Sequence, residues 1–400
     1  MKYVRHTFSL LVVAASVLLL AACGQKSSCN GITFGASGGS GSGTGSGVNS
    51  GGSSCGVGSN NGGGGGSASD FVFYRGSSGA NNAIDTAELT ATTFQVVPGV
   101  AALTGNSTTG TMVVVKKQFL YLPDQNGSGG VMGFSINHTD GGLTPIPGSP
   151  FAAPSAVTTI VADPDANGAR FLFTVDFTSG DFNAFTINAS TGALTLVPSS
   201  LSFPGYQATD LKIDGTGNYL YSIAAGTRQG TLGFLVDQNS GALTPVSGSP
   251  FQYYATGIQI NPAGTFMLAV TGANQIDVIP IEQGTGNLLL SSLASFPTVN
   301  LVDSLVMHPS GNFVYTFGTR IAMEGFQFTG GALTELTGSP YTSLSDLGAC
   351  QFDQSGTALF GILTPSNQVG VRIINPTTGD VTAGPPDLSV QTGPYFAVTN

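Results

Sequence analysis

Few side chains in this sequence are of types that catalyse reactions or bind ligands. The most informative of them occupy equivalent positions in a repeated sequence pattern. Only 8% of the 400 residues are charged. Asp210 and Asp303 stand near the start of corresponding segments, and Lys212 follows the first of them by two residues. Carboxylates of this kind occur together with hydroxyl groups, at Thr158, Thr159, Thr209, Thr256 and Ser304. Such a group could bind a hard cation such as Ca²⁺, because that ion takes oxygen ligands.

Further polar residues flank the same segments. Asp346 and Thr392 precede two of them, and Lys212, Gln259 and Gln351 share one deeper position. Tyrosines and an arginine lie in the connecting loops. The candidate ligand-binding residues are therefore Asp210, Lys212, Asp303, Asp346, Tyr253, Tyr254 and Arg228. The same polar groups would also suit the wall of a water-filled channel, and the sequence leaves both interpretations open.

The His and Cys residues stand in no catalytic or metal-binding pattern. His308 fills a turn position that other segments give to Asp or Asn, and His138 lies in a glycine-rich turn, so both are expected to be turn residues. Cys350 lies in an apolar segment and is expected to be an unpaired core residue. Neither glycine motif that cradles phosphates is present. The sequence identifies no catalytic residue, and no organic cofactor is expected.

Composition limits the class of protein. The formal charge is −10, and only 11 residues are Lys or Arg, so binding to nucleic-acid phosphates is not expected. Surface helices need a charged face, which a chain with 8% charged residues cannot supply. The bulk of the chain must therefore be β-structure.

The segments that position these side chains belong to a repeat. The phrase Gly-Leu-Thr-Pro-Ile-Pro-Gly-Ser-Pro-Phe of residues 142–151 returns with changes in residues 241–251 and 331–341. Weaker copies stand at Leu194, Leu288, Val381 and, most degenerate, Phe94. The copies are about 48 residues apart, a period typical of repeat architectures. Residues 70–400 have room for about seven such units.

Each unit contains four apolar runs of strand length separated by turn residues. In the fourth unit the runs are residues 209–213, 219–224, 231–237 and 243–246. Four antiparallel strands in each of seven units predict an all-β protein, a seven-bladed β-propeller. A parallel solenoid of the same period is the alternative, but it would leave an open hydrophobic end at each terminus.

The two ends of the repeat region favour a closed ring. Residues 392–400 match the first strand of a unit, whereas residues 71–74 match a second strand with no first strand before it. We therefore expect the C-terminal strand to join the first blade as its innermost strand. Closure removes edges that would otherwise template aggregation, so a monomeric ring is expected.

The N-terminal residues predict that the protein is located in the cell envelope. Lys2 and Arg5 precede an apolar run over residues 10–20, which is short for a membrane span and typical of a secretion signal. The Leu-Ala-Ala-Cys string of residues 20–23 resembles the bacterial lipobox, which implies a signal peptide over residues 1–22 and lipidation of Cys23. Gly24 after the cysteine implies, by the same resemblance, anchoring in the outer membrane. An ordinary signal peptide with a coincidental cysteine is the alternative.

A low-complexity segment follows the lipobox-like string. Residues 23–69 are mostly Gly and Ser and cannot bury enough apolar surface to offset their ordering entropy, which predicts a flexible tether. Cys29 and Cys55 lie within it and could pair in an oxidising periplasm, a question the sequence leaves open. The folded domain is expected to be residues 70–400.

The repeat units resemble those of a known family. The Phe-Leu-Tyr-Leu of residues 119–122, the Tyr-Phe-Ala-Val-Thr-Asn of residues 395–400 and the Asx-Pro-x-Gly turns are similar to bacterial seven-bladed propellers with YVTN-type repeats. These are grouped with the lactonase-like family that includes 6-phosphogluconolactonase. The resemblance implies the fold, and for lactone-processing members it implies a central pocket with His, Arg and Glu side chains that polarise a carbonyl and handle a proton. This sequence lacks that pattern, because no His falls in a loop on the pocket face, so we carry over no catalytic residue.

Two functions from different classes follow. The first is an envelope-anchored lipoprotein whose propeller binds a glycan, a peptide or a neighbouring envelope protein, with the membrane as a partner through the lipid anchor. The alternative is a lactonase-like hydrolase that acts on a small lactone or ester at the axial mouth of the ring. The lack of His and the scarcity of Arg at the mouth favour the first, whereas converging Asp, Lys and Arg would favour the second.

Overall fold

The computed structural model describes residues 70–76, 83–90, 93–97, 102–103, 111–124, 129–318, 322–341, 347–363, 368–389 and 396–399. The expected signal peptide, the tether, Cys23, Cys29 and Cys55 lie outside these residues. Within the described ranges, no helix has the length and apolar character needed to span a membrane.

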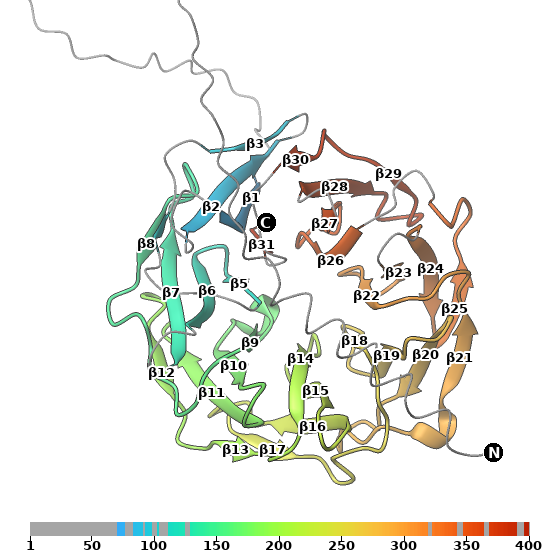
Figure 1. The fold of residues 1–400 in the computed structure, drawn as a ribbon, viewed down its shortest axis with the longest axis horizontal. Helices are drawn as coiled ribbons and strands as arrows, with labels where there is room; N and C mark the ends of the chain where they lie inside the picture. The colour runs from blue at the N-terminus through green and yellow to red at the C-terminus, as the bar shows by residue number, and fades with distance from the viewer. Residues whose placement is uncertain are drawn as a thin grey trace, which may run out of the picture. The chain divides into compact units, whose positions relative to one another are not determined.

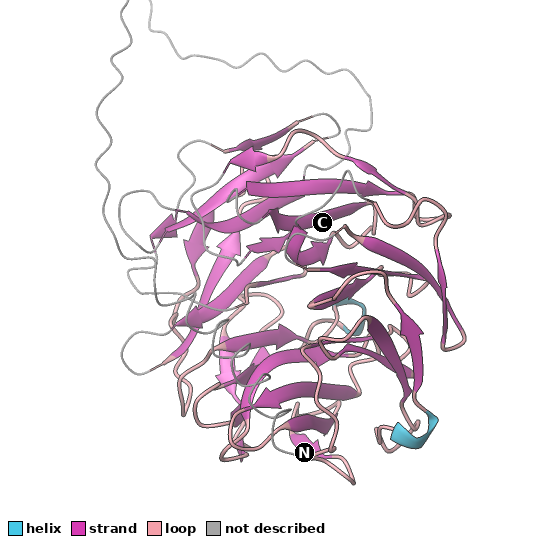
Figure 2. Cartoon of the chain, turned by 45° about the vertical axis from the view of Figure 1, so that its right-hand side comes forward, coloured by secondary structure: helices cyan, strands magenta, loops and turns pink. Residues whose placement is uncertain are grey.

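The described strands form seven antiparallel sheets around a central axis (Figure 1). Each sheet has four main strands, with the first strand nearest the axis, so the predicted seven-bladed β-propeller is confirmed. Figure 2 shows that nearly all of the regular structure is strand. The helical turns in the described part of the chain are η1 (Asp165–Asn167) and η2 (Leu290–Ser292).

Blades 1 to 4 form the first part of the ring. Blade 1 consists of β31 (Phe396–Val398), β1 (Asp70–Gly76), β2 (Ala83–Leu89) and β3 (Phe94–Val96), with β4 (Ala102–Leu103) also paired to β2. Blade 2 consists of β5 (Val113–Val115), β6 (Phe119–Asp124), β7 (Gly130–Ile136) and β8 (Leu143–Pro145). Blade 3 consists of β9 (Thr159–Ala162), β10 (Phe171–Val175), β11 (Asp181–Ile187), β12 (Leu194–Leu196) and β13 (Leu201–Ser202). Blade 4 consists of β14 (Gln207–Ile213), β15 (Tyr219–Ala225), β16 (Gly230–Val236) and β17 (Leu243–Pro245).

Blades 5 to 7 complete the ring. Blade 5 consists of β18 (Gly257–Ile260), β19 (Phe266–Val270), β20 (Gln275–Pro280) and β21 (Ala294–Pro297). Blade 6 consists of β22 (Ser304–Met307), β23 (Phe313–Phe317), β24 (Glu324–Thr329) and β25 (Ala332–Glu335). Blade 7 consists of β26 (Leu347–Phe352), β27 (Ala358–Leu363), β28 (Gln368–Ile374), β29 (Val381–Ala383) and β30 (Leu388–Ser389).

The outermost strand departs from the predicted pattern in blade 5. Leu288, which the repeat places at the start of this strand, forms only an isolated bridge with Ile281. The turn η2 follows, and the regular strand β21 begins at Ala294. In blades 3 and 7 the outer edge is likewise split into two short strands that pair with opposite ends of the third strand. Short, interrupted edge strands limit strand pairing between molecules. The repeated sequence motif does not reveal where such interruptions occur.

The second strand of a blade lies deepest in the ring. Every residue of β6, β10 and β23 is buried, because both faces of a blade pack against neighbouring blades. Three buried tyrosines link one blade to the next, since each phenol donates a hydrogen bond of 2.6 Å to a glycine carbonyl of the following blade. The pairs are Tyr121 with Gly192, Tyr221 with Gly286, and Tyr315 with Gly379. These bonds satisfy phenols that would otherwise be buried without partners.

The ring is closed by the C-terminal strand, as predicted. β31 pairs antiparallel with β1, with Val398 opposite Val72. Thr399 extends this pairing, because its hydroxyl oxygen accepts a hydrogen bond of 2.7 Å from the Phe71 amide and its own amide donates to the Phe71 carbonyl at 2.8 Å. The C-terminal segment therefore supplies the innermost strand of the blade whose other strands lie at the start of the ring.

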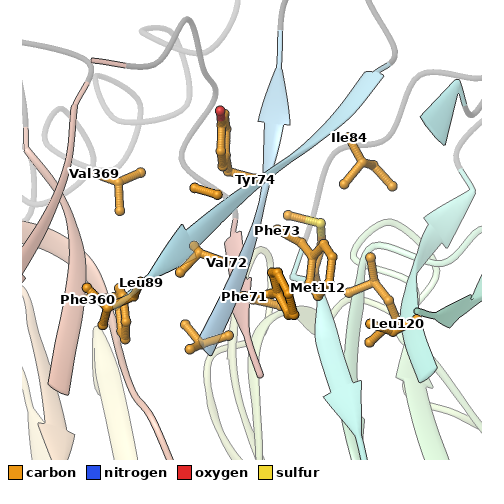
Figure 3. Packing of buried hydrophobic residues seen from close by; sticks show 14 of the residues in the cluster. Phe71, Val72, Phe73, Tyr74, Ile84, Leu89, Met112, Leu120, Phe360 and Val369 are labelled. Carbon is orange, nitrogen blue, oxygen red and sulfur yellow. The ribbon is translucent and has the colours of Figure 1, made fainter. Parts of the chain in front are cut away.

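The apolar cluster of blade 1 depends on this closure. Figure 3 shows Phe71, Val72 and Phe73 lying between Phe360 of blade 7 and Leu120 of blade 2. All five side chains are buried. The two ends of the repeat region thus meet in a single hydrophobic cluster.

The turns between the first and second strands confirm the predicted role of His308. In blades 4, 5 and 7 the turn carboxylate or amide accepts backbone amides; for example, Asn261 Oδ1 accepts from Phe266 at 2.8 Å. His308 Nδ1 likewise accepts a backbone amide, that of Ser310 at 3.0 Å, and lies 2.8 Å from the Ser310 hydroxyl, while Nε2 contacts the carbonyl of Gly356 in the next blade at 3.0 Å. Burial lowers the pKa of His308, although the Gly356 contact opposes this effect. His138 is an exposed turn residue, also as predicted.

Removal of residues 396–400 should destabilise the whole ring. The deletion would expose the sites of Ala397 and Val398, which are 0% and 7% exposed, and would remove the Thr399 bonds. We expect a loss of about 3–5 kcal/mol in the free energy of unfolding, measured by chemical denaturation. Thr399→Val keeps the strand and should cost only about 1–2 kcal/mol, while Thr382→Val on the exposed outer edge should cost less. An unchanged unfolding curve for the deletion would rule out closure by this strand.

His308→Asn should make the ring less sensitive to acid. Because the pKa of His308 is lowered in the folded state, the unfolded chain binds this proton more readily, and the stability contributed by the neutral imidazole is lost as the pH falls below about 6.5. Asn occupies the same turn position in blade 5 and does not titrate. Denaturation curves at pH 7.5 and pH 5 should show a smaller loss of stability in the variant. An equal loss in both proteins would show that His308 does not titrate on unfolding.

Candidate functional site

A cavity of about 620 Å³ lies on the axis of the ring, within the first strands of blades 2 to 7. Its wall combines backbone and apolar side chains with a limited set of polar ones. Among the described residues, these polar side chains belong to Thr111, Thr209, Asp210, Lys212, Thr256, Gln259, Asp303, Ser304, Cys350 and Gln351. The cavity has the size of a small-molecule site.

Strand geometry explains why these side chains face the axis. Successive residues of a strand point to opposite faces, so every second residue of an innermost strand can face the cavity. Lys212, Gln259 and Gln351 each stand two residues before the turn residue of their blade, and all three line the wall, as the repeat implies. Val161 and Val306 take the same place in blades 3 and 6, which leaves this layer partly apolar.

Two β-bulges change the direction of side chains on the cavity wall in blades 4 and 7. In β14 the register shifts between Ala208 and Asp210, and in β26 it shifts between Gly348 and Gln351. A bulge inserts an extra residue and turns the strand locally, which brings neighbouring side chains to a new face. Ala349, within the second bulge, has a φ of 45°, a left-handed conformation that costs energy in a residue other than glycine. The chain therefore holds a strained backbone at the cavity wall.

The charged centre of the cavity is an ion pair within one strand. Lys212 Nζ lies 3.2 Å from Asp210 Oδ1, and the two side chains are 34% and 24% exposed. Asp210 Oδ1 also accepts the amide of Leu211 at 2.9 Å. Asp303 is exposed on the wall contributed by blade 6. Three of the predicted ligand-binding residues, Asp210, Lys212 and Asp303, thus come together at one site.

Three other candidates lie off the described wall. The Tyr253 hydroxyl donates a hydrogen bond of 2.8 Å to Asp277, and burial, with this carboxylate beside it, raises the pKa of the phenol. Tyr254 is half-buried away from the cavity lining. The exposed Arg228 guanidinium stacks 6.0 Å from the ring centre of Tyr206. Asp346 and Thr392 lie outside the described residues.

Cys350 lines the cavity, a position that the sequence reasoning did not assign to it. It is a free cysteine, half-buried, that also packs against the apolar cluster between blades 6 and 7. Burial raises the pKa of its thiol well above the usual value, while the charge of Arg372 acts in the opposite direction. A neutral thiol is a poor nucleophile, so Cys350 contributes shape and polarity to the wall rather than reactivity. Aligning the segment around Cys350 with the other innermost strands would have indicated that this residue lies at the cavity.

The metal-binding potential of the site is limited in the part of the chain that the structure describes. There, no three His, Cys, Asp or Glu side chains are grouped so that they could hold a metal ion. Asp210 and Asp303 are the carboxylates that the described wall presents. The binding of Ca²⁺ therefore stays a prediction from the sequence.

Comparison with known proteins supports the architecture. No protein-family model and no curated protein matches this chain. Solved structures match along most of it. A protein from Lactobacillus plantarum has a TM-score of 0.64 and 16% identity, over 83% of this chain and 99% of its own. The likeness shows the fold alone.

Two further similar structures carry names that mention lactonases. A candidate 6-phosphogluconolactonase from Bacteroides fragilis has a TM-score of 0.61 and 16% identity, over 83% of this chain and 98% of its own. The periplasmic gluconolactonase of Pseudomonas aeruginosa has a TM-score of 0.60 and 14% identity, over 83% of this chain and 99% of its own. These likenesses show the fold alone, and function must be argued from the residues on the wall of this ring.

Proposed function

We propose that the propeller is a binding module that holds a small, uncharged, hydroxyl-rich molecule, such as a sugar or another polyol, in its axial cavity. The observation that supports this most is the composition of the described wall. It combines the Asp210–Lys212 pair with hydroxyl and amide side chains, and its described part contains no His, Arg or Glu.

Each part of the wall has a role in such binding. The carboxylates of Asp210 and Asp303 would accept hydrogen bonds from ligand hydroxyls, and the Lys212 ammonium would donate one. The side-chain amides of Gln259 and Gln351 both donate and accept, which suits a hydroxyl group that does the same. Two carboxylates against one ammonium leave the described wall net negative, which disfavours anionic ligands such as sugar acids or phosphates.

Lactone hydrolysis is the second candidate, favoured by the names of two structural neighbours. In this reaction Asp210 or Asp303 would take a proton from the attacking water, and the Lys212 ammonium would stabilise the oxyanion that forms on the carbonyl oxygen. The ring C–O bond would then break, and the departing oxygen would leave as a hydroxyl after receiving the proton. The partly exposed ion pair of Asp210 with Lys212 suits binding better, because both groups can bond to a ligand hydroxyl while they stay paired, whereas hydrolysis would require Asp210 to take a proton from water.

Binding should depend on Lys212 and Asp210 but not on Arg228. Calorimetric titration of the full chain with glucose, galactose, glucono-1,5-lactone and gluconate should show saturable binding of a neutral member, with gluconate weaker. Lys212→Met and Asp210→Asn should each weaken that binding about tenfold or more, because each removes a charged hydrogen-bonding partner. Their stability should change by less than about 1 kcal/mol, since the pair is partly exposed.

Arg228→Ala is the matched control, because it removes an exposed charge away from the cavity. It should leave the affinity within twofold of the natural protein. Absence of binding by every compound, or equal weakening by all three variants, would contradict the proposed site.

The proposed place of action is the cell envelope, with a lipid anchor at Cys23. The Leu-Ala-Ala-Cys string at residues 20–23 and the Gly/Ser-rich segment after it support this part of the proposal. A periplasmic location in the name of one structural neighbour is consistent with it. A glycan, a peptide or an envelope protein that presents hydroxyl groups would be within reach of such a module.

Cys23→Ser should release the protein from the membrane fraction of a bacterial host. Acyl chains contribute about 0.8 kcal/mol per buried methylene, and stable anchoring needs more than one chain. Fractionation with metabolic labelling by a fatty-acid analogue should show label on the natural chain and none on the variant. The matched control is Cys29→Ser, which should keep both label and membrane association. Label that persists in Cys23→Ser would exclude this cysteine as the lipidation site.

A further inference from the structure

A second cavity lies at the opposite end of the axis, among the turns that join first and second strands. Its volume is about 540 Å³. Residues of five consecutive blades, 3 to 7, line it. It shares the lining residues Ile213, Gln259 and Met307 with the axial cavity, so the two cavities adjoin there.

The wall of this cavity is largely apolar and rigid. Pro164, Pro262 and Pro309 contribute one proline from each of three turns, and Ile260 is buried against the floor. Proline has a fixed φ, so these turns lose little entropy when a ligand binds. His308 also lines the cavity, but both of its ring nitrogens already contact Ser310 and Gly356.

The rim of this cavity includes a turn in blade 3 that is longer than the equivalent turns of blades 4 to 7. In blades 4 to 7 the hydrogen bond that closes the turn joins residues five apart, such as Asn261 and Phe266, whereas in blade 3 it joins Asp163 and Phe171, eight apart. The extra residues form η1 and include Asp165 and Ala166, which line the cavity. The regular turns suffice to build a blade, so the longer turn adds contacts that a single blade does not require.

The inserted turn is fastened across the axis. Asp165 Oδ1 and Oδ2 both accept the Lys116 amide of blade 2, at 3.0 Å each. Gln354 of blade 7 donates from Nε2 to Asp165 Oδ2 at 2.7 Å. The neighbouring blade 2 and the distant blade 7 therefore both hold this edge of the cavity in place.

We propose that this turn-face cavity is a second ligand site, for a small uncharged molecule with an aromatic or branched aliphatic body and one hydrogen-bonding group. Ile213 and the three prolines would pack against the body, and the Gln259 amide would meet the polar group. The Asp165 carboxylate is the charged group on the described rim, and it disfavours anions. The volume lies within the range of sites for molecules of this size.

Neutral N-phenyl-1-naphthylamine, whose fluorescence rises in apolar surroundings, is a suitable probe for the full chain. Ala166→Trp places a large side chain at the rim from an exposed position, and it should weaken saturable probe binding at least tenfold. Ala263→Trp is the matched control: Ala263 is also exposed, in the equivalent turn of blade 5, but is not part of the lining. It should change the affinity less than twofold.

Gln354→Ala provides a second variant, because it removes the bond across the axis together with the part of the wall that Gln354 contributes. It should weaken the probe several-fold without filling the cavity, and thermal unfolding should show that all three variants are folded. Equal affinities for Ala166→Trp and Ala263→Trp would overturn the site, as would the absence of saturable binding to the natural chain. Neither outcome would bear on sugar binding in the axial cavity, which the titrations with Lys212→Met test separately.

Discussion

The pairing of β31 with β1 is the constraint on which the rest of the ring depends. A blade has two apolar faces and can bury them only against neighbouring blades, so an open chain of blades would expose both of its ends. The three residues of β31 and the bonds of Thr399 with Phe71 remove those ends by joining the two termini of the repeat region. The axial cavity exists only as a consequence, because its wall is the set of innermost strands held around the axis.

Within the closed ring, many of the repeated features serve the structure of the blades. The repeated features, such as the tyrosines that reach the next blade and the Asx turns, satisfy buried polar groups and keep the blades in register. The irregular features that lie at a cavity are the bulges in β14 and β26 and the longer turn of blade 3. The two proposed sites therefore combine repeated positions, such as those of Gln259 and Gln351, with places where the chain departs from its own pattern.

Most of the fold was predictable because a 48-residue period with four apolar runs has few structural solutions. The strands of blade 4 match the predicted ranges within two residues at each end. For the site, the repeat register correctly implied that Lys212, Gln259 and Gln351 share one layer. It could not reveal that Tyr253 bonds to Asp277, because that contact joins a loop side chain to a side chain of β20 that is distant in sequence. It also missed the bulge beside Cys350, since one extra residue shifts a strand without changing its composition.

We propose that the axial cavity binds a hydroxyl-rich molecule without converting it. The most direct test is proton release by the full chain in the presence of a panel of small lactones and esters, with added Ca²⁺ and separately with a chelator. The account predicts rates equal to those of buffer alone under both conditions, with the protein folded. Turnover well above the buffer rate that Asp210→Asn or Asp303→Asn abolishes would contradict it and identify the cavity as an active site.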